Sequence, residues 1–390
     1  MWFNSCMTSP HERGFPLYIG VTGHRDIEPA SARELVRIVN LQLRRLVGAI
    51  PSTGVRILSG MAPGADLIVA RAAVEAGVPV EAVLPMPLAR YLEDFDAGWR
   101  LELQDLLAHP LVHSIELTPT GNLDEQGGRD DSYRSLGAAL ARRSSLLLAV
   151  WDGHSARLRG GTSDTVLHYL GCDSESGGGS GEPVFVTEAA APRAGDTVVY
   201  WVPVSRAGTR APAAVADACF LSGAGQNRLL MHAGLPDAIA ADWRDLDRIN
   251  RSYQRLLESG GPAPRTSLLE SVAVDARHAD PMLLKAIDRG CAIAEALVMP
   301  VPRRAGLLGL LRSLRYRVLR RREELARQAA CRTLAETLRV KFYLVAAGAD
   351  YRVDPQEWFR LSGADAFAGC GWIRAALRSV EPTDVAHGVQ

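Results

Sequence analysis

The sequence predicts an α/β fold, in which a Rossmann-like parallel sheet with helices on both faces precedes a mainly α-helical C-terminal region. Over the first 205 residues, short apolar runs alternate with segments of helical periodicity, an order typical of parallel sheets covered by helices. Beyond about residue 211 the strand signals fade and long helical patterns take over. Glycine-containing turns also follow three of the apolar runs: Gly20–Asp26, Ser59–Asp66 and Gly160–Thr165.

Six apolar runs are predicted to be strands, because each is short and bounded by turn signals. They span residues 17–22, 55–59, 80–84, 112–117, 146–151 and 197–204. The spacing of apolar residues predicts helices over 31–46, 65–75 and 163–171, and one further helix face formed by Tyr133, Leu136, Ala139 and Leu140. The last strand is predicted to close the sheet. Residues 171–183, rich in glycine, serine and acids, are predicted to form a solvated insertion.

Four segments follow from this pattern. We expect a disordered N-terminus over residues 1–14, the Rossmann-like domain over 15–205, a linker over 206–240 and a helical region over 241–390. Within the last segment, helices are predicted over 242–257, 281–297 and 307–344, separated by stretches that contain glycine and proline.

The composition is that of an ordinary soluble protein, with 47% hydrophobic and 23% charged residues. Lys+Arg and Asp+Glu both number 44, so no net charge draws the chain toward nucleic acid or membrane. The six cysteines lie far apart without a CxxC motif, which argues against a zinc site or a disulfide framework. No stretch is apolar enough for a signal peptide or a transmembrane helix. We therefore expect a cytoplasmic protein without a metal or a cofactor.

The first turn predicts part of a phosphate-binding crevice. Gly23 allows the backbone to pass close to a ligand, and Thr22, His24 and Arg25 supply donors. The alternative is a tight β-α turn with solvated charges. The ligand interpretation gains weight because two similar turns follow, and the carboxyl ends of parallel strands meet at one edge of a sheet.

The second turn offers a hydroxyl and several backbone N–H groups. The Ser59 hydroxyl and the N–H groups between Gly60 and Gly64 are predicted to cradle a phosphate. Asp66 is predicted to cap the helix that follows, since acids are common at helix N-termini. Its alternative role is to hold a ribose hydroxyl.

The third turn is the most suggestive of the three. Gly160 and Gly161 open a helix, so that backbone N–H groups and the side chains of Thr162 and Ser163 face a bound phosphate. No lysine follows the glycines, so the turn is not a P-loop. Asp152, one residue beyond an apolar strand, is predicted to contact the ligand at the same edge.

These runs resemble the SLOG superfamily, which groups the DNA-processing protein DprA with the LOG (lysine decarboxylase-like) phosphoribohydrolases. Ser59–Asp66, SGMAPGAD, is similar to the SGxAxGxD run of the DprA branch. Gly160–Thr162 resembles the PGGxGT run of the LOG branch, and Tyr133–Asp152 resembles SLOG proteins of bacterial conflict systems. The resemblance covers residues 15–205. It implies a nucleotide-binding domain that acts as a ligand sensor in bacterial defence, in a family whose members often self-associate.

The resemblance also implies an enzymatic alternative. LOG enzymes use a glutamate soon after the glycine-threonine turn to cleave an N-glycosidic bond. Ser163–Val166 follows the turn here, without a glutamate. Asp164 is the only candidate for that role, and its shorter side chain favours a binding protein over a hydrolase. The alternative is a phosphoribohydrolase-like enzyme that acts on a nucleoside monophosphate.

The C-terminal half resembles the soluble flanks of SLATT modules over residues 332–340 and 372–377, but the transmembrane hairpin of those modules is missing. Eight arginines and no acid fall within Arg303–Arg322, among several leucines. A basic amphipathic helix binds an anionic membrane surface, nucleic acid or an effector protein. The other possibility is an ordinary helix with solvated arginines.

The leading hypothesis for the whole chain is a nucleotide sensor in which the helical half reports whether the ligand is bound. The second hypothesis is the hydrolase, and the third is an adaptor that works through the arginines of Arg303–Arg322.

Overall fold

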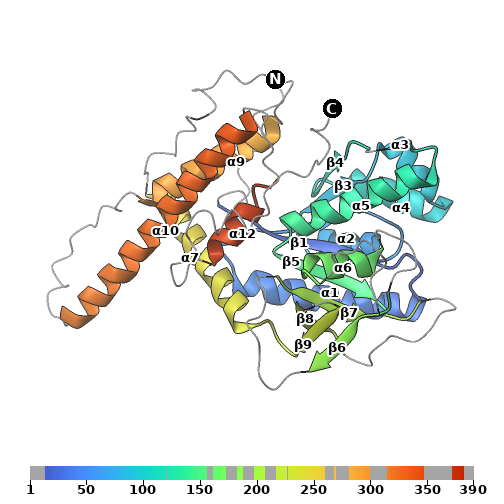
Figure 1. Cartoon of the computed structure of the whole chain (residues 1–390), viewed down its shortest axis with the longest axis horizontal. Coiled ribbons are helices and arrows are strands. Elements are labelled where there is room, and N and C mark those ends of the chain that lie inside the picture. Colours follow the sequence, from blue (N-terminus) through green and yellow to red (C-terminus); the bar gives the residue numbers. More distant parts are fainter. Residues whose placement is uncertain are drawn as a thin grey trace. The chain divides into compact units, whose positions relative to one another are not determined.

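In the computed structural model the chain folds into two compact units (Figure 1). The α/β unit comprises Leu17–Pro51, Val55–Ala240 and Glu381–Gln390, and the helical unit comprises Met1–Pro16, Ser52–Gly54 and Ala241–Val380. The structure describes residues 14–119, 121–155, 161–172, 182–187, 197–206, 217–225, 227–259, 268, 281–298, 314–346 and 371–381.

The described part of the α/β unit contains one nine-stranded sheet of order β4-β3-β2-β1-β5-β7-β8-β9-β6. Its strands are β1 (Leu17–Gly23), β2 (Val55–Ser59), β3 (Val80–Leu84), β4 (Val112–Glu116), β5 (Leu146–Trp151), β6 (Val184–Thr187), β7 (Val199–Pro203), β8 (Cys219–Gly223) and β9 (Arg228–His232). The helices are α1 (Pro29–Ala49), α2 (Ala65–Glu75), α3 (Leu88–Tyr91), η2 (Leu92–Asp94), α4 (Ala97–Leu107), α5 (Gln126–Arg143) and α6 (Thr162–Tyr169). The predicted α/β fold is confirmed.

The even-numbered residues of β1 face α5, and the odd-numbered ones face α2. Tyr18 belongs to one apolar cluster with Leu136 and Leu140 of α5. A Cβ on Gly23 would instead lie 2.4 Å from the Cβ of Ala65, the first residue of α2. Because α1 packs against α2 and α6 packs against α5, helices cover both faces of the sheet, as predicted.

The sheet is mixed rather than wholly parallel, and the predicted last strand does not close it. β7 and β8 are antiparallel, as are β8 and β9, whereas β6 pairs parallel to β9. β8 and β9 lie inside the segment 206–240 that the sequence predicts to be a linker. They form a hairpin in which Gly225 and Asn227 take positive φ, and so short a connection between neighbouring strands requires an antiparallel pair.

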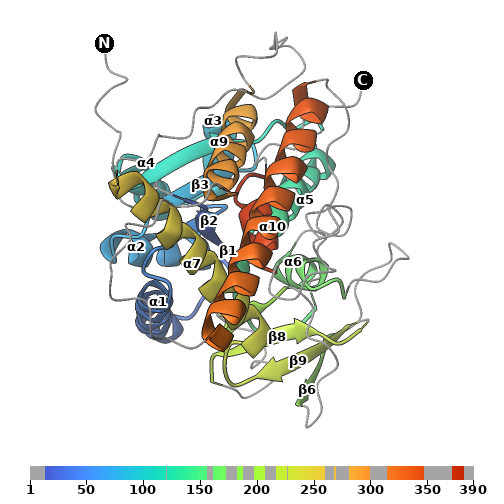
Figure 2. The same cartoon turned by 90° about the vertical axis from the view of Figure 1, so that its left-hand side faces the viewer.

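The described helices of the helical unit are α7 (Asp237–Glu258), α9 (Pro281–Val298), α10 (Leu314–Ala346) and α12 (Trp372–Arg378). α9 and α10 pack along each other (Figure 2). α7 anchors two backbone segments: Asn250 exchanges two hydrogen bonds of 2.9 Å with the backbone of Phe15, and Asp247 accepts from the Ser52 N–H and the Thr53 hydroxyl.

The predicted basic segment Arg303–Arg322 falls largely outside the described residues. α10 begins at Leu314, and no side chain before residue 324 of this helix is described. Within the part of the chain that the structure describes, no helix is both long enough and apolar enough to cross a membrane.

Candidate functional site

The strand order creates a switch point between β1 and β5. From β1 the chain proceeds to β2, β3 and β4 on one side, and it then returns to β5 on the other side. β1 and β5 are parallel, and Gly23 pairs with Val150 where both strands end. Ligands of open α/β sheets bind beyond the carboxyl ends of the strands at such a point. The predicted turns that the structure describes follow β1, β2 and β5, so they lie at this edge.

The glycines of the first two turns serve contacts between the turns themselves. A Cβ on Gly23 would lie 2.8 Å from the Val150 carbonyl oxygen as well as against Ala65. Gly64 has φ +83°, and a Cβ there would lie 2.4 Å from the carbonyl oxygen of Arg25. The Ala65 N–H donates to the His24 carbonyl over 3.0 Å. Close packing of the two turns therefore accounts for the glycines that were predicted to allow the approach of a ligand.

The second turn holds a strained residue. Met61 has φ +57°, a left-handed conformation that costs a residue with a side chain about 1–2 kcal/mol. The Ser59 hydroxyl accepts the Met61 N–H over 3.0 Å, and the Tyr91 hydroxyl donates to the Gly60 carbonyl over 2.9 Å. The Ser59 side chain thus stabilises the turn internally. Strain of this kind collects at ligand sites in proteins.

Asp66 is a buried carboxyl beneath this turn. It lies in the first turn of α2, but the N-cap residue is Gly64 and no side chain caps the helix. Asp66 instead accepts the Ala62 N–H over 3.4 Å. The predicted cap role is therefore wrong, because the carboxylate binds the turn before α2 and not the free N–H groups of the helix. Burial raises the pKa of Asp66 to about 7, against the opposing effects of the Ala62 N–H and the Arg25 charge.

His24 meets Asp152 across the switch point. The His24 Nε2 atom lies 3.0 Å from Oδ1 of Asp152 and 3.1 Å from its backbone N–H. Burial raises the pKa of Asp152, but the hydrogen bonds from His24 and from the His154 N–H outweigh burial and hold it below its usual range. Both side chains are nearly buried. This contact joins two predicted site residues that are 128 positions apart.

Arg206 extends this group on the β7 side. Its guanidinium makes a bidentate pair with Asp26, with Nε–Oδ1 and Nη2–Oδ2 distances of 2.9 Å, and its Nη1 lies 3.9 Å from Oδ2 of Asp152. Arg206 was not among the site residues predicted from the sequence. Its position two residues after the last predicted strand, at the edge where ligands bind, is the feature that would have pointed to it.

Arg25 points to the other side, toward α5. It is exposed, and its guanidinium carbon lies 5.1 Å from the centroid of the Tyr133 ring. Among the described residues, no carboxylate forms an ion pair with Arg25, whereas Arg206, Arg129 and Arg143 each have one. An arginine at a ligand-binding edge without an acidic partner is suited to bind an anion.

The third turn is described from Gly161 onward, and Gly160 lies outside the described residues. Gly161 is the N-cap of α6 with φ −75° and ψ 178°, and no side chain caps the helix. Its carbonyl accepts the Thr165 N–H over 3.1 Å. Thr162 and Ser163 are buried, and Asp164 lies half-buried in the first turn. Thr22 is the second-last residue of β1 and pairs with Ala149 of β5.

α5 and α6 bring the third turn toward Arg25. A Cβ on Gly137 would lie 3.0 Å from the Thr165 hydroxyl, so the two helices touch there. Both helices start at the carboxyl edge of the sheet, because each follows a strand and leads back toward the start of a parallel one. Tyr133 and Gly161 each precede this contact by one helical turn. The Arg25 guanidinium and the α6 N-terminus therefore lie on the same edge.

No group of three or more His, Cys, Asp or Glu side chains suited to a metal ion occurs among the residues that the structure describes. The four cysteines in the described ranges, Cys172, Cys219, Cys291 and Cys331, are buried and form no disulfide with one another.

No protein-family model matches the chain, and no curated protein does. Among solved structures, the chain is similar to DNA processing protein A from Helicobacter pylori, a protein with a single-stranded DNA binding mode, at 18% identity and a TM-score of 0.27 over 45% of this chain and 67% of that one. DprA from Streptococcus pneumoniae gives the same identity and TM-score over 45% of this chain and 51% of its own. The match thus spans about half of the second protein, and a TM-score of 0.27 is too low to support a functional inference.

Proposed function

We propose that the α/β unit binds a nucleotide or a nucleotide-derived ligand through its phosphate at the carboxyl edge of β1 and β5. The observation that carries the proposal is Arg25, an exposed cation at the switch point without an ion pair to any described carboxylate. The N-terminus of α6, at the same edge and without a side-chain cap, adds the positive end of a helix dipole. Together they favour a phosphate over a neutral ligand.

The helical unit is proposed to report occupancy. A ligand shifts a conformational equilibrium only as far as its affinities for the two states differ. If α9 and α10 respond to the ligand, their amide hydrogen exchange changes when the α/β unit is saturated. Unchanged exchange in both helices, with binding demonstrated in the same sample, would remove the sensor part of the proposal and leave the binding part intact.

The first experiment is a binding screen of the purified full chain by native mass spectrometry. The probes are AMP, ATP, cyclic AMP, NAD and ADP-ribose, with a single-stranded DNA oligomer to separate mononucleotide from polynucleotide binding. The same samples are analysed for released base. Base release would favour the hydrolase, for which Asp164 in the first turn of α6 is the candidate carboxyl. Absence of binding to every probe would contradict the proposal.

Replacement of Arg25 by Gln is expected to weaken AMP binding by about 10- to 100-fold, because a charged hydrogen bond contributes about 1.5–3 kcal/mol. Isothermal titration calorimetry measures the effect. Arg44→Gln is the matched control, because Arg44 is an exposed arginine of α1, whose end lies toward the opposite edge of the sheet. Equal affinities of the wild type, Arg25→Gln and Arg44→Gln for AMP would show that the phosphate does not bind at Arg25.

Replacement of Gly161 by Asp is expected to abolish AMP binding while thermal stability is kept. The φ of −75° is open to any residue, and Asp is among the best N-cap residues, but its carboxylate repels a phosphate at the same helix end. Gly161→Asn is the control of nearly equal size that caps without charge. We expect the Asn variant to retain binding. Loss of binding in both variants would point to steric obstruction instead of charge.

A further inference from the structure

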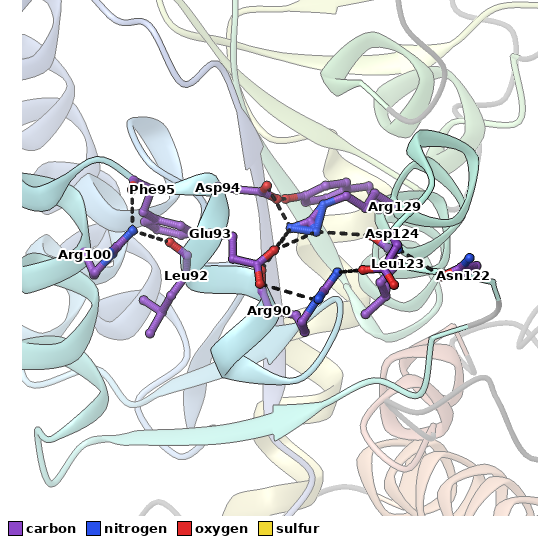
Figure 3. Close-up of polar contacts among 11 residues, drawn as sticks. Arg90, Leu92, Glu93, Asp94, Phe95, Arg100, Asn122, Leu123, Asp124 and Arg129 are labelled. Atoms are coloured by element: carbon purple, nitrogen blue, oxygen red, sulfur yellow. Dashed lines mark hydrogen bonds and ion pairs between the residues drawn. The ribbon is translucent and has the colours of Figure 1, made fainter.

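Arg129 joins two segments beside the candidate site to the start of α5 (Figure 3). Its Nη2 donates to the Arg90 carbonyl over 3.0 Å and to Oδ1 of Asp94 over 3.1 Å. Its Nη1 donates to the Leu123 carbonyl over 3.4 Å. These contacts hold the α3–η2 segment and the loop before α5 in place, and they orient the carboxylate of Asp94.

Asp94 in turn fixes Tyr133. The Tyr133 hydroxyl donates to Oδ2 of Asp94, the oxygen that Arg129 leaves unused. Arg129 and Tyr133 are four residues apart and therefore lie on the same face of α5. Burial raises the pKa of Tyr133 to about 12, so the phenol stays neutral and remains a donor at physiological pH.

The Tyr133 ring is held on a second side by aromatic packing. The Tyr91 ring centroid lies 6.2 Å from that of Tyr133, and Tyr91 is fully buried with its hydroxyl bonded to Gly60 of the second turn. The Arg25 guanidinium carbon lies over the Tyr133 ring, 5.1 Å from its centroid. A guanidinium stacked on a fixed ring keeps its edge N–H groups in a defined plane, which suits a bidentate bond to two oxygens of one phosphate.

We propose that Tyr133 is a positioning residue, which holds the Arg25 guanidinium in the orientation that binds a phosphate monoester of the ligand. The chain of contacts runs from Arg129 through Asp94 and Tyr133 to Arg25. This inference rests on the proposed function, because it assumes that Arg25 is the phosphate-binding side chain. It goes further by naming the group that orients this side chain and the kind of phosphate contact that results.

The position of Arg25 is tested first without any ligand. Phenylglyoxal modifies exposed guanidinium groups, and peptide mass mapping measures the rate at each arginine. In Tyr133→Leu the rate at Arg25 is expected to rise several-fold. Tyr133→Phe keeps the ring but loses the hydroxyl and its contacts with Asp94 and Arg25, so a smaller rise is expected. Arg44, exposed on α1, is the internal reference. An unchanged Arg25 rate in Tyr133→Leu would overturn the positioning role, whatever the ligand.

The second measurement uses AMP as the probe. Loss of the cation–π contact in Tyr133→Leu is expected to weaken AMP binding by about fivefold to tenfold, with a smaller loss in Tyr133→Phe, which keeps the ring. In the background of Arg25→Gln the Tyr133→Leu change is expected to have no further effect, because Tyr133 acts through Arg25. An equal loss in both backgrounds would show that Tyr133 serves the fold or touches the ligand itself. Absence of AMP binding in the wild type contradicts the proposed function, whereas the ligand-free rates still test the position of Arg25.

Discussion

Arg143→Met is expected to lower the free energy of unfolding of the α/β unit by about 3–5 kcal/mol, because it leaves a buried carboxylate without its cation. Arg143, the last residue of α5, and Glu81 of β3 are both buried, and two hydrogen bonds join them, of which Nη2–Oε2 measures 3.1 Å. The guanidinium also lies 4.4 Å from the centroid of the Tyr18 ring, so the variant loses a cation–π contact as well.

Urea denaturation measures this loss, with hydrogen exchange of peptides from β1 and β3 as the readout, so that the unfolding of the α/β unit is observed by itself. The matched control is the double variant Glu81→Leu/Arg143→Met, which removes both charges and is expected to recover most of the stability. A loss of less than about 1 kcal/mol in Arg143→Met would mean that the pair behaves like a solvated surface salt bridge.

Asp66→Asn is expected to remove a strong dependence of stability on pH. The pKa of Asp66 is about 7 in the folded protein against 3.8 for an exposed carboxyl. Between these values the folded state binds more protons than the unfolded state, so stability falls as pH rises, by about 1.4 kcal/mol per pH unit. Below pH 3.8 both states are protonated, and above pH 7 the cost is constant. The amide does not titrate, so the variant gains on the wild type by about 2 kcal/mol between pH 5 and pH 7.

Urea denaturation of the wild type and Asp66→Asn at several pH values measures this difference, in which all other titrating groups cancel. Asp217→Asn, a change at an exposed aspartate of the same unit, is expected to leave the pH dependence of the wild type unchanged. A difference between wild type and Asp66→Asn that stays constant with pH would show that the Asp66 carboxyl titrates alike in the folded and unfolded states.

The strands of the switch point were predictable because they are buried on both faces. β1, β2, β3 and β5 are mainly apolar runs bounded by turns, with a single charged residue in β2 and in β3, and their observed bounds agree with the predicted runs to within one residue. Parallel strands covered by helices on both faces require such runs. The β8–β9 hairpin was missed because both of its strands include polar residues and β8 ends in glycine, and because its fold depends on β7, with which β8 pairs.

The partners of the candidate site residues were not predictable in the same way. The sequence places His24 and Arg25 side by side, and only the fold directs the first toward Asp152 and the second toward Tyr133. Gly23 and Gly64 likewise looked like sites of ligand approach, whereas the structure packs them against Ala65 and the Arg25 backbone. A glycine in a turn indicates that some group lies close to the backbone, but it does not indicate whether that group is a ligand or another part of the protein.

The sequence by itself determined the alternation of strands and helices, the places where the turns fall and the residue types that those turns carry. These properties depend on local spacing of apolar residues and on backbone freedom, which a single segment contains. The tertiary structure alone decided the order of the strands, the pairing of His24 with Asp152 and the position of Arg25 over the Tyr133 ring. Such contacts join groups more than 100 positions apart, so they depend on which strands become neighbours. That choice is made by the packing of the whole unit.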